Sequence, residues 1–510
     1  MPTTPSQPLA AVADGDALHV GAGSPAFPKL FSPLKLGNLA LPNRVVMAAM
    51  SSSLADTDGF VTPELVAFLR ARAEGGCGLV IVEFTCVESR WGLGELHQPR
   101  IDLDAHVAGH ATLVRAITDG GARACLQLHL PGQYVVRDPA TGRPAPFGTM
   151  AVAPSDVYAP AGQKLARALE AAEVEALVQS FAAGARRALR AGYQAIEVHG
   201  AHGYLPMAFM SPRKNFRDDA WGGDFERRLA FPLAVVLALR AVLDRNQPLI
   251  YRLSAVEFAE CGLTEADMAR IVPRLAEAGC TALHVSTGTV EGALDKIVDP
   301  MSSTAGWRFP LARRLREASG LPVMAVGPVR WPQAAEAALC ADDVDLIALG
   351  RPLLADPHWA RKSKEGRLAD LTPCTSCNWC MDRVRQHAAI GCAENPSTGR
   401  ETEAAAARPT AGVVAAVVGG GPAGLHAALL LDAMGYRTHL FEARPALGGG
   451  LVVSAAPPFK DPLLWYRDHL RHRIEASGVV LHLGRPALAT ELLALKPALA
   501  IIATGSEPRP

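Results

Sequence analysis

The stretch EVHGAHGYLPMAFMSPRKNFRDDAWGGDFERR, residues 197–228, decides how the rest of the chain is interpreted. The apolar run at 194–198 predicts a buried strand, and polar chemistry begins where that strand ends, with His199, His202 and Tyr204. Two imidazoles can donate hydrogen bonds to one oxygen, and a phenol beside them can deliver a proton. We therefore expect a catalytic site at the carboxyl end of this strand. A pair of structural histidines is the alternative for an isolated HxxH.

The same pattern of strand followed by helix repeats from residue 28 to residue 366. Each short apolar run precedes a segment of helical periodicity, for example 173–191 and 264–278. Strands of nearly continuous Val, Ile and Leu between helices indicate a parallel sheet covered on both faces. Eight such units predict an α/β fold, a (β/α)8 TIM barrel, with a doubly wound open sheet as the alternative. The predicted strands are residues 44–48, 78–83, 122–128, 194–199, 248–253, 281–286, 321–326 and 344–349.

A barrel of this kind predicts chemistry where strands end and loops begin. The candidates at such ends are Gln127, His199, Arg252, Gly327, Gly350 and Arg351. Glycine-bearing loops after strands seven and eight are the usual phosphate site of these barrels, because bare backbone N–H groups can approach an anion there. An arginine adds a planar cationic fork suited to phosphate.

Four cysteines crowd into the segment after the predicted barrel. Cys374, Cys377, Cys380 and Cys392 form C-x2-C-x2-C-x11-C, which can hold zinc or a [4Fe–4S] cluster. In a chain without an export signal, such a group favours metal over disulfides. Three cysteines on one loop with a distant fourth, and no histidine at the ligand spacing, favour the cluster.

A dinucleotide-binding fingerprint follows. Gly419-x-Gly421-x-x-Gly424 comes directly after the apolar run 413–418, opens a predicted helix, and is followed by Glu442 at the end of the next strand. With strand, helix and acid all in place, the fingerprint is specific. We expect the pyrophosphate at the helix N-terminus and the adenosine ribose hydroxyls on Glu442.

Composition limits the remaining possibilities. A chain of 510 residues is long enough for two or three domains, and a net charge of zero with 20% charged residues does not suggest nucleic acid as a partner. No apolar run approaches the roughly 18 to 20 residues of a membrane span, and no signal peptide is evident, so a cytoplasmic location is expected. The predicted segments are a flexible tail (1–27), the barrel (28–370), the cluster segment (371–400), a linker (401–411) and a partial dinucleotide-binding domain (412–510).

HGAHGYL followed by SPRKNFRDDAWGGDFERR resembles the signature of the Old Yellow Enzyme family of flavoenzymes, and LFSPLKLGNLALPNRVVMAAM resembles the opening of that family. The resemblance implies that FMN binds the barrel. Carried over position by position, the FMN ring would contact Ala49, Met50 and Ser51, its pyrimidine edge Gln127, its N1/O2 side Arg252, and its phosphate Gly327, Gly350 and Arg351.

The cysteine spacing followed by N-P-x-x-G-R-E resembles the multi-cofactor branch of this family, which includes 2,4-dienoyl-CoA reductase, 2-enoate reductase and trimethylamine dehydrogenase. The resemblance implies a [4Fe–4S] cluster, and Glu442 with the glycines that follow it favours FAD over NAD. No second Gly-rich dinucleotide turn follows Glu442, where the branch has an NAD(P)H-binding domain. Either the sequence is a fragment, or the protein receives electrons without a pyridine-nucleotide site of its own. NAD(P)H is a candidate external donor, and a missing NAD(P)H-binding domain or a separate electron-transfer partner is the alternative.

Three functions remain open for a small-molecule substrate. The histidine pair and Tyr204 favour an ene reductase acting on an enone, enoate or dienoyl thioester. The cysteine spacing is nearer to an amine dehydrogenase of the trimethylamine dehydrogenase type, but His199 and Ser51 stand where that enzyme has a tyrosine and a flavin-anchoring cysteine. An electron-carrying subunit is the third, and homo-oligomerisation is open. His129 lies one place early against the family pattern, so no catalytic role is assigned to it.

Overall fold

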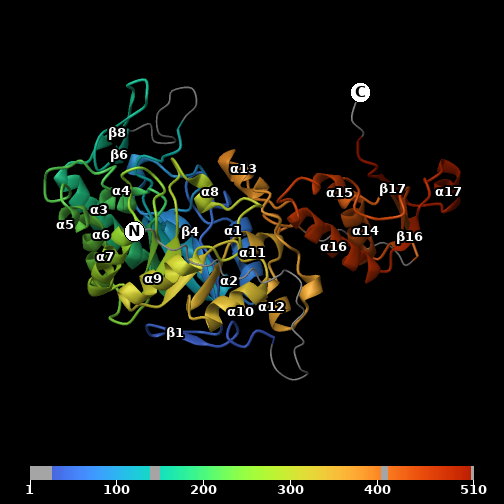
Figure 1. Ribbon diagram of the computed structural model, residues 1–510, viewed down its shortest axis with the longest axis horizontal. Helices are drawn as coiled ribbons and strands as arrows, with labels where there is room; N and C mark the ends of the chain where they lie inside the picture. The colour runs from blue at the N-terminus through green and yellow to red at the C-terminus, as the bar shows by residue number, and fades with distance from the viewer. Residues whose placement is uncertain (1–25, 138–149, 404–411, 507–510) are drawn as a thin grey trace, which may run out of the picture.

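The computed structural model describes residues 26–137, 150–403 and 412–506. A closed barrel occupies one end of the molecule and a separate open sheet the other, with the cysteine segment between them (Figure 1). The eight parallel barrel strands are β3 (Val45–Met47), β4 (Leu79–Cys86), β5 (Arg123–His129), β9 (Ala195–Gly200), β10 (Leu249–Ser254), β11 (Ala282–Ser286), β12 (Val323–Val326) and β13 (Leu346–Leu349). The TIM-barrel prediction is confirmed, and the ends of the predicted strands differ from those observed by at most three residues.

Helices cover the outside of the barrel because their apolar stripes pack on the strands. The longer ones are α1 (Pro63–Glu74), α2 (Val107–Asp119), α3 (Ala171–Ala191), α6 (Ala230–Arg240), α7 (Glu265–Glu277), α9 (Phe309–Ser319), α10 (Pro332–Cys340) and α12 (Trp359–Lys364). Local signals set their ends. The Thr264 hydroxyl accepts from the backbone N–H of Asp267 at the start of α7, and Gly192 ends α3 at a φ of 96°.

An antiparallel hairpin of β1 (Leu34–Leu36) and β2 (Leu39–Leu41) closes the amino end of the barrel. Leu36 and Leu41 are buried against the side chains that fill the barrel interior. The turn between the strands requires glycine, because Gly37 has a φ of 58° and an added Cβ would lie 2.2 Å from a backbone oxygen.

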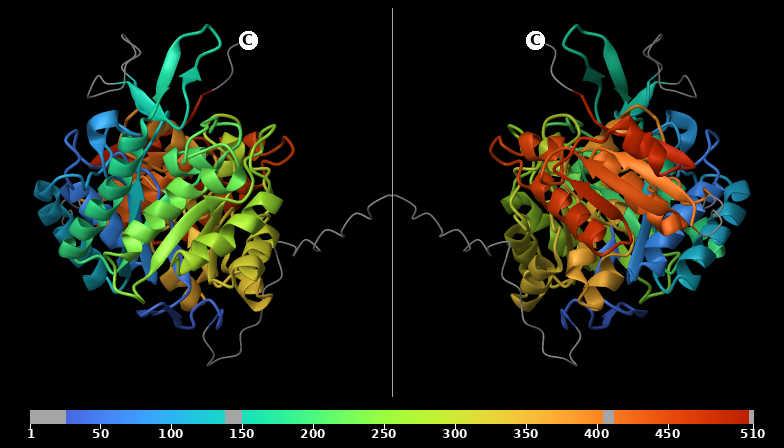
Figure 2. Two further views of the ribbon diagram at one scale, coloured as in Figure 1. Left: turned by 90° about the vertical axis from the view of Figure 1, so that its left-hand side faces the viewer. Right: turned by 90° about the vertical axis from the view of Figure 1, so that its right-hand side faces the viewer.

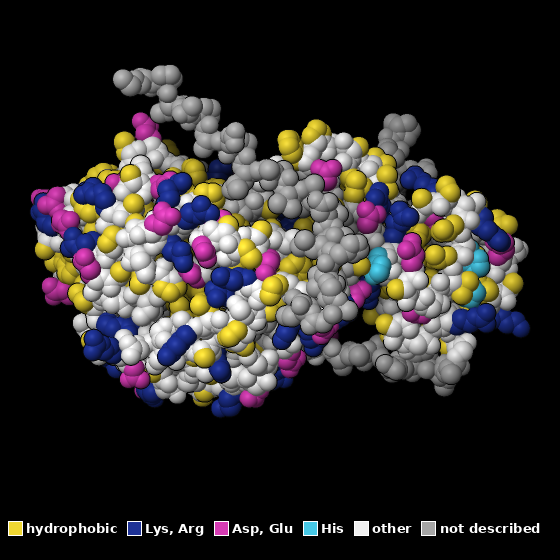
Figure 3. Space-filling model, turned by 60° about the horizontal axis from the view of Figure 1, so that its bottom comes forward, with side chains coloured by type: hydrophobic (Ala, Val, Ile, Leu, Met, Phe, Trp, Pro, Cys, Tyr) yellow, Lys and Arg dark blue, Asp and Glu magenta, His cyan; other side chains and the backbone are white. Residues whose placement is uncertain are grey.

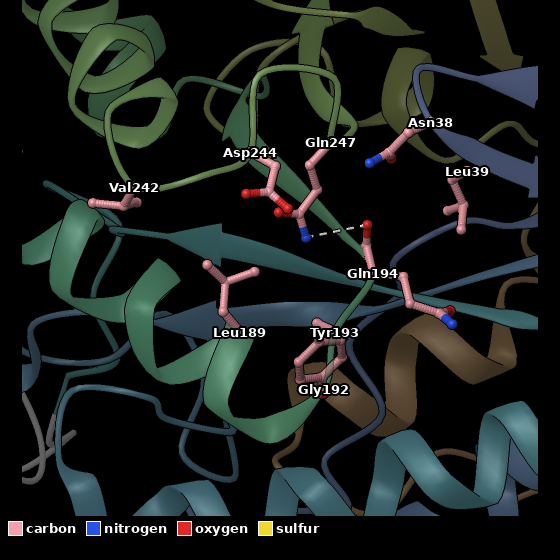
Figure 4. A pocket seen from close by; sticks show the side chains of 9 residues that line it. All are labelled: Asn38, Leu39, Leu189, Gly192, Tyr193, Gln194, Val242, Asp244 and Gln247. Carbon is pink, nitrogen blue, oxygen red and sulfur yellow. Dashed lines mark hydrogen bonds between the residues drawn. The ribbon is translucent and has the colours of Figure 1, made fainter.

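A cavity of about 560 Å³ lies beside this hairpin, at the amino end of the barrel (Figure 4). Its lining comes from the hairpin turn, the end of α3 and the segments before β9 and β10. Gln247 reaches across it, and its Nε2 donates to the backbone oxygen of Gln194 at 3.4 Å. Barrel chemistry is found at the opposite, carboxyl end, so this cavity is not the candidate site.

A short three-stranded sheet projects from the barrel between β5 and α3 (Figure 2). It consists of β6 (Ala151–Ala153), β7 (Val157–Tyr158) and β8 (Lys164–Ala168). On the face drawn in Figure 3, basic and acidic side chains are interspersed, without a large field of one sign. Within the described residues, no helix combines the length and apolarity needed to cross a membrane.

The C-terminal unit is a four-stranded parallel sheet in the order β16-β15-β14-β17. Its strands are β14 (Val414–Val418), β15 (Arg437–Glu442), β16 (Val480–Leu483) and β17 (Leu499–Ile502), and its helices are α14 (Pro422–Met434), α15 (Gly450–Ser454), α16 (Pro462–Glu475) and α17 (Ala489–Ala494). The helices α14 and α16 pack together and cover one face of the sheet with apolar side chains.

The junction between the barrel and the C-terminal sheet is formed largely by α16. The hydroxyl of Tyr466 donates to the backbone oxygen of Glu394 at 3.3 Å, and the ring of Trp465 lies 6.1 Å from that of Trp331. Residues 1–25 of the predicted tail and 404–411 of the predicted linker lie outside the described residues. Residues 26–27, assigned to the tail in the prediction, are buried in the barrel core.

Candidate active site

Polar side chains begin two residues after the apolar layer that fills the barrel. Because alternate residues of a strand point to the same side, the residue two places after an inward-facing apolar residue also points inward. Cys125, Ala195, Ile250 and Ala282 form part of the apolar interior. The positions two places later are Gln127, Glu197, Arg252 and His284, all of them buried. The barrel therefore changes from apolar to polar near the carboxyl ends of its strands.

Glu197 links three strands of this polar layer. Its carboxylate accepts a hydrogen bond from Gln127 Nε2 at 2.6 Å on one side and contacts His284 Nδ1 at 2.8 Å on the other. Arg252 lies in the same layer, and its Nη1 donates to the backbone oxygen of Ala49 at 3.0 Å. Burial lowers the pKa of Arg252 and of His284, and the nearby Glu197 charge opposes both shifts. Gln127 is thus fixed by the neighbouring strand β9, and Arg252 by the segment after β3, across the barrel from β10.

His199 and His202 lie together above this layer, with ring centroids 5.1 Å apart. His202 has a left-handed φ of 63°, which its surroundings impose: its N–H donates to Ser254 Oγ at 3.0 Å and its Nε2 bonds Ser286 Oγ at 2.8 Å. His199 Nδ1 is buried without a hydrogen-bond partner among the described residues. Burial and the neighbouring positive groups lower the pKa of both imidazoles well below the usual value, so both are neutral near pH 7.

Tyr204 completes the predicted group. Its ring centroid is 4.7 Å from that of His199, and it precedes the short helix α4 (Leu205–Met210). Burial raises the pKa of its phenol to about 12, so the hydroxyl keeps its proton at neutral pH. The structure therefore brings together the two imidazoles and the phenol that the sequence predicted to act as one site.

A third histidine joins this group. The ring of His129 lies 5.1 Å from that of His199 and 4.4 Å from that of Tyr204, and no described residue bonds either of its nitrogens. Burial lowers its pKa to about 3. The family pattern assigned no catalytic role to His129, but the period of two along β5 places it in the site, because His129 follows Gln127 on the same inward face.

The residues expected around a flavin ring lie at the end of β3. Ala49 is buried, Met50 is partly buried, and Ser51 Oγ is buried with no hydrogen-bond partner in the described part of the chain. Met50 lies against the end of β13, since a Cβ on Gly350 would be 3.0 Å from its sulfur. The first and last barrel strands thus meet at the expected flavin position.

The expected phosphate residues occupy the loops after β12 and β13. Gly327 follows β12 and lies near Arg308, a buried arginine that the sequence did not single out and whose Nη1 donates to Asp299 at 2.8 Å. Gly350 precedes α11 (Arg351–Ala355). The Arg351 side chain bonds the backbone oxygen of Asp299 at 2.7 Å and also the side chain of Asn378. It therefore connects the expected phosphate loops to the cysteine segment.

Cys374, Cys377, Cys380 and Cys392 line one cavity together with Arg351 and its neighbours. The loop wraps around this cavity through left-handed turns at Ser376 and Asn378, and the Ser376 N–H points at Cys374 Sγ, 3.4 Å away. Burial raises the pKa of all four thiols. Within the described residues, no group of three or more His, Cys, Asp or Glu side chains is arranged to hold a metal ion.

The predicted Gly-rich turn joins β14 to α14. Gly419 has a φ of 111°, Gly421 caps the helix, and a Cβ on Gly424 would lie 1.9 Å from the Gly419 backbone oxygen. Glu442 ends β15, and its carboxylate accepts the Gly420 N–H at 2.6 Å. Strand, turn, helix and acid therefore have the arrangement that the fingerprint predicts.

The closed barrel and its polar carboxyl end define an (β/α)8-barrel enzyme. Residues 29–370 match the NADH:flavin oxidoreductase / NADH oxidase family, and residues 415–480 match FAD dependent oxidoreductase. The chain belongs to the NADH:flavin oxidoreductase / NADH oxidase family and is a flavin-dependent oxidoreductase.

Three relatives match this chain over nearly its whole length. NADH oxidase of Thermoanaerobacter brockii is 39% identical over 94% of this chain and 73% of its own length. N,N-dimethylglycine/sarcosine dehydrogenase of Chromohalobacter salexigens is 30% identical over 94% of this chain and 70% of its own. The structure of 2-naphthoyl-CoA reductase with 2-naphthoyl-CoA superposes with a TM-score of 0.88 at 28% identity, covering 95% of this chain and 75% of the other.

Proposed function

We propose that the protein is an ene reductase that reduces the carbon–carbon double bond of an α,β-unsaturated carbonyl compound. The observation that carries this proposal is the convergence of His199, His202 and Tyr204 at the buried carboxyl end of the barrel. Neutral imidazoles donate hydrogen bonds, and a carbonyl oxygen that gains negative charge during reduction needs donors of this kind. The similarity to 2-naphthoyl-CoA reductase supports the same class of reaction.

The residues at the barrel end fit an FMN. Ser51 Oγ and Arg252 Nε are buried without a hydrogen-bond partner among the described residues, and buried polar groups of this kind indicate a ligand. We propose that Ala49, Met50 and Ser51 contact the flavin ring, that Gln127 and Arg252 bind its polar edge, and that the loops of Gly327, Gly350 and Arg351 hold its phosphate. When bound in its reduced form, FMN supplies hydride to the substrate.

The chain's own groups then control the substrate. His199 and His202 bind the carbonyl oxygen and polarise the conjugated double bond. Tyr204, whose phenol keeps its proton at neutral pH, delivers that proton to the carbon next to the carbonyl. The His129 ring packs against Tyr204 but does not take the phenol proton, because burial lowers the pKa of His129 and keeps its ring neutral.

The test is anaerobic. The purified protein is reduced with dithionite to the equivalence point and mixed with cyclohexenone or cinnamate, and the flavin absorbance is followed. We expect rapid reoxidation that falls by about 10²- to 10⁴-fold in Tyr204→Phe, the usual contribution of a general acid. Tyr158→Phe is the matched control, since Tyr158 is exposed on β7. Failure of every enone, enoate and enoyl thioester to reoxidise the flavin would contradict the proposal.

An amine dehydrogenase is the second candidate, favoured by the similarity to N,N-dimethylglycine/sarcosine dehydrogenase. For an amine dehydrogenase, a methylated amine should bleach the oxidised flavin, and enones should not reoxidise the reduced flavin. The oxidised and the dithionite-reduced forms of the same purified protein therefore separate the two candidates.

We also propose that the four cysteines hold a [4Fe–4S] cluster and that the C-terminal turn binds FAD. The four thiols line one cavity, and three of them come from one short loop with the fourth further along the chain, a spacing that supports a cluster. The expected result is about four iron atoms per chain with acid-labile sulfide, both lost in Cys392→Ser. NAD(P)H as external donor, a separate electron-transfer partner, the cytoplasmic location and homo-oligomerisation stay predictions.

A further inference from the structure

A second polar cluster lies at the mouth of the site, and the proposed reaction does not use it. Its members are Tyr134 after β5, Arg213 and Lys214 after α4, and Glu291 after β11. The Glu291 carboxylate accepts from the Tyr134 hydroxyl at 3.1 Å, is bonded by Lys214 Nζ, and lies 3.8 Å from Arg213 Nη1. The Glu291 carboxylate thus contacts two adjacent cations from one loop of the barrel and a phenol from another.

This cluster adjoins the reacting groups. The Tyr134 ring centroid is 5.9 Å from that of Tyr204, and a Cβ on Gly203 would lie 3.1 Å from the Tyr134 hydroxyl. The loop that carries Glu291 runs beside His202, where the Val290 N–H donates to the His202 backbone oxygen at 3.1 Å. A substrate bound at the histidine pair can therefore extend to the cluster.

Two buried polar atoms here have no hydrogen-bond partner among the described residues. Thr289, with only 1% of its surface exposed, leaves its Oγ1 unbonded beside Gly203, and the Nη1 of Arg213 is buried at ion-pair rather than hydrogen-bond distance from Glu291. Most buried polar atoms in proteins are hydrogen-bonded, so these two point to a ligand. The charges of Arg213 and Lys214 also act on the buried carboxyl group of Glu257, so the group that suits an anion here is the unbonded Nη1 of Arg213, a cationic donor.

We propose that Arg213, Lys214, Tyr134 and Thr289 form an anion subsite, which selects substrates that carry a carboxylate or phosphate distant from the reacting double bond. This inference rests on the proposed ene reduction and names its substrate class. Glu291 is the internal counter-ion that the substrate anion displaces from the cations. Burial raises its pKa, but the hydrogen bond and charge of Lys214, with those of Tyr134 and Arg213, lower it overall, so the displaced group is a carboxylate.

The first test measures binding without turnover. Holoenzyme is titrated by calorimetry with the saturated ketone acid 4-(3-oxobutyl)benzoate and with its neutral methyl ester. We expect the acid to bind about ten- to hundredfold more tightly, and Arg213→Gln and Lys214→Gln to remove most of that preference. Arg115→Gln, on the exposed face of α2, is the matched control. Equal binding of acid and ester by the wild type would overturn the anion subsite.

The second test uses the internal carboxylate. Glu291→Gln removes the competitor of the substrate anion, so the acid is expected to bind several-fold more tightly while the ester is unchanged. A cluster that only braces the loops would give no gain for the acid, and that result would overturn the counter-ion role.

The third test separates this inference from the reaction itself. Four compounds are offered to the reduced enzyme: the α,β-unsaturated counterpart of 4-(3-oxobutyl)benzoate, the methyl ester of that unsaturated acid, and an unsaturated CoA thioester with and without its 3′-phosphate. Faster reoxidation by the unsaturated acid than by its ester assigns the subsite to a substrate carboxylate. Faster reoxidation that depends on the 3′-phosphate assigns it to the nucleotide phosphate. If the saturated acid binds preferentially but no unsaturated compound reoxidises the flavin, the subsite stands and ene reduction falls.

Discussion

The barrel and the C-terminal sheet are built from the same unit, a parallel strand followed by a turn and a helix, but they expose their strands very differently. Every residue of β9, β10 and β11 is buried, whereas residues alternate between partly buried and exposed along β17, and Ile502 has 67% of its surface exposed. Closure gives each barrel strand two neighbours and an interior. The barrel can therefore hold neutral histidines and a buried carboxylate, while the open sheet offers mainly backbone at its Gly-rich turn.

Gly424→Ala tests whether the two regions bind their cofactors independently. The added methyl would meet the Gly419 backbone oxygen at 1.9 Å, a contact that backbone movement must relieve, so we expect the proposed FAD binding to be lost. The barrel flavin should stay at full occupancy, because no barrel strand takes part in this turn. Gly450→Ala is the control, since nothing lies within 4 Å of its added Cβ. Cofactor content after denaturation measures both, and loss of FMN together with FAD would contradict the independence of the two regions.

A matched pair of isoleucines tests the difference in strand burial. Ile250 is wholly buried in the barrel interior, and Ile502 is exposed on the outer strand of the C-terminal sheet. Ile250→Ala should lower the free energy of unfolding by about 2–5 kcal/mol, the range for a buried side chain that leaves a cavity. Ile502→Ala should change it by less than about 0.5 kcal/mol. Urea unfolding followed by circular dichroism measures both, and equal losses would show that strand closure does not set the difference.

The pH dependence of stability tests the buried histidines. Burial lowers the pKa of His129 from 6.5 to about 3, so between these values the unfolded chain binds a proton that the folded chain does not. Stability from this residue is therefore fully present above pH 6.5 and is lost as the pH falls, by about 1.4 kcal/mol per pH unit. His129→Leu should abolish that part of the acid sensitivity, measured as the difference in unfolding free energy between variant and wild type from pH 7 to pH 4. Parallel pH profiles for the two proteins would exclude the depressed pKa.

Sequence predicted the barrel well because its signals are local and repeated: each strand is a short apolar run, and each helix shows its own period. The grouping of His199, His202 and Tyr204 was predictable for the same reason, since all three follow one strand. Long-range contacts were not. The bond between Glu197 on β9 and His284 on β11 joins two residues 87 positions apart, on strands that lie on either side of β10 in the barrel. The cluster around Glu291 likewise joins three loops, and no spacing in the sequence predicts which loops will meet.

Glu197→Gln offers the finest test of what barrel closure contributes. In the wild type the carboxylate accepts from Gln127 Nε2, so the amide oxygen of Gln127 remains as an acceptor for a donor on the proposed flavin edge. A neutral amide at position 197 accepts a weaker bond and can pair with Gln127 in either orientation, so this alignment is lost. We expect FMN affinity to fall about tenfold and its reduction potential to shift, with the fold intact. Glu226→Gln, at an exposed position, is the control. Unchanged affinity and potential would mean that Glu197 only fills the barrel, and that the alignment of Gln127 comes from β5 alone.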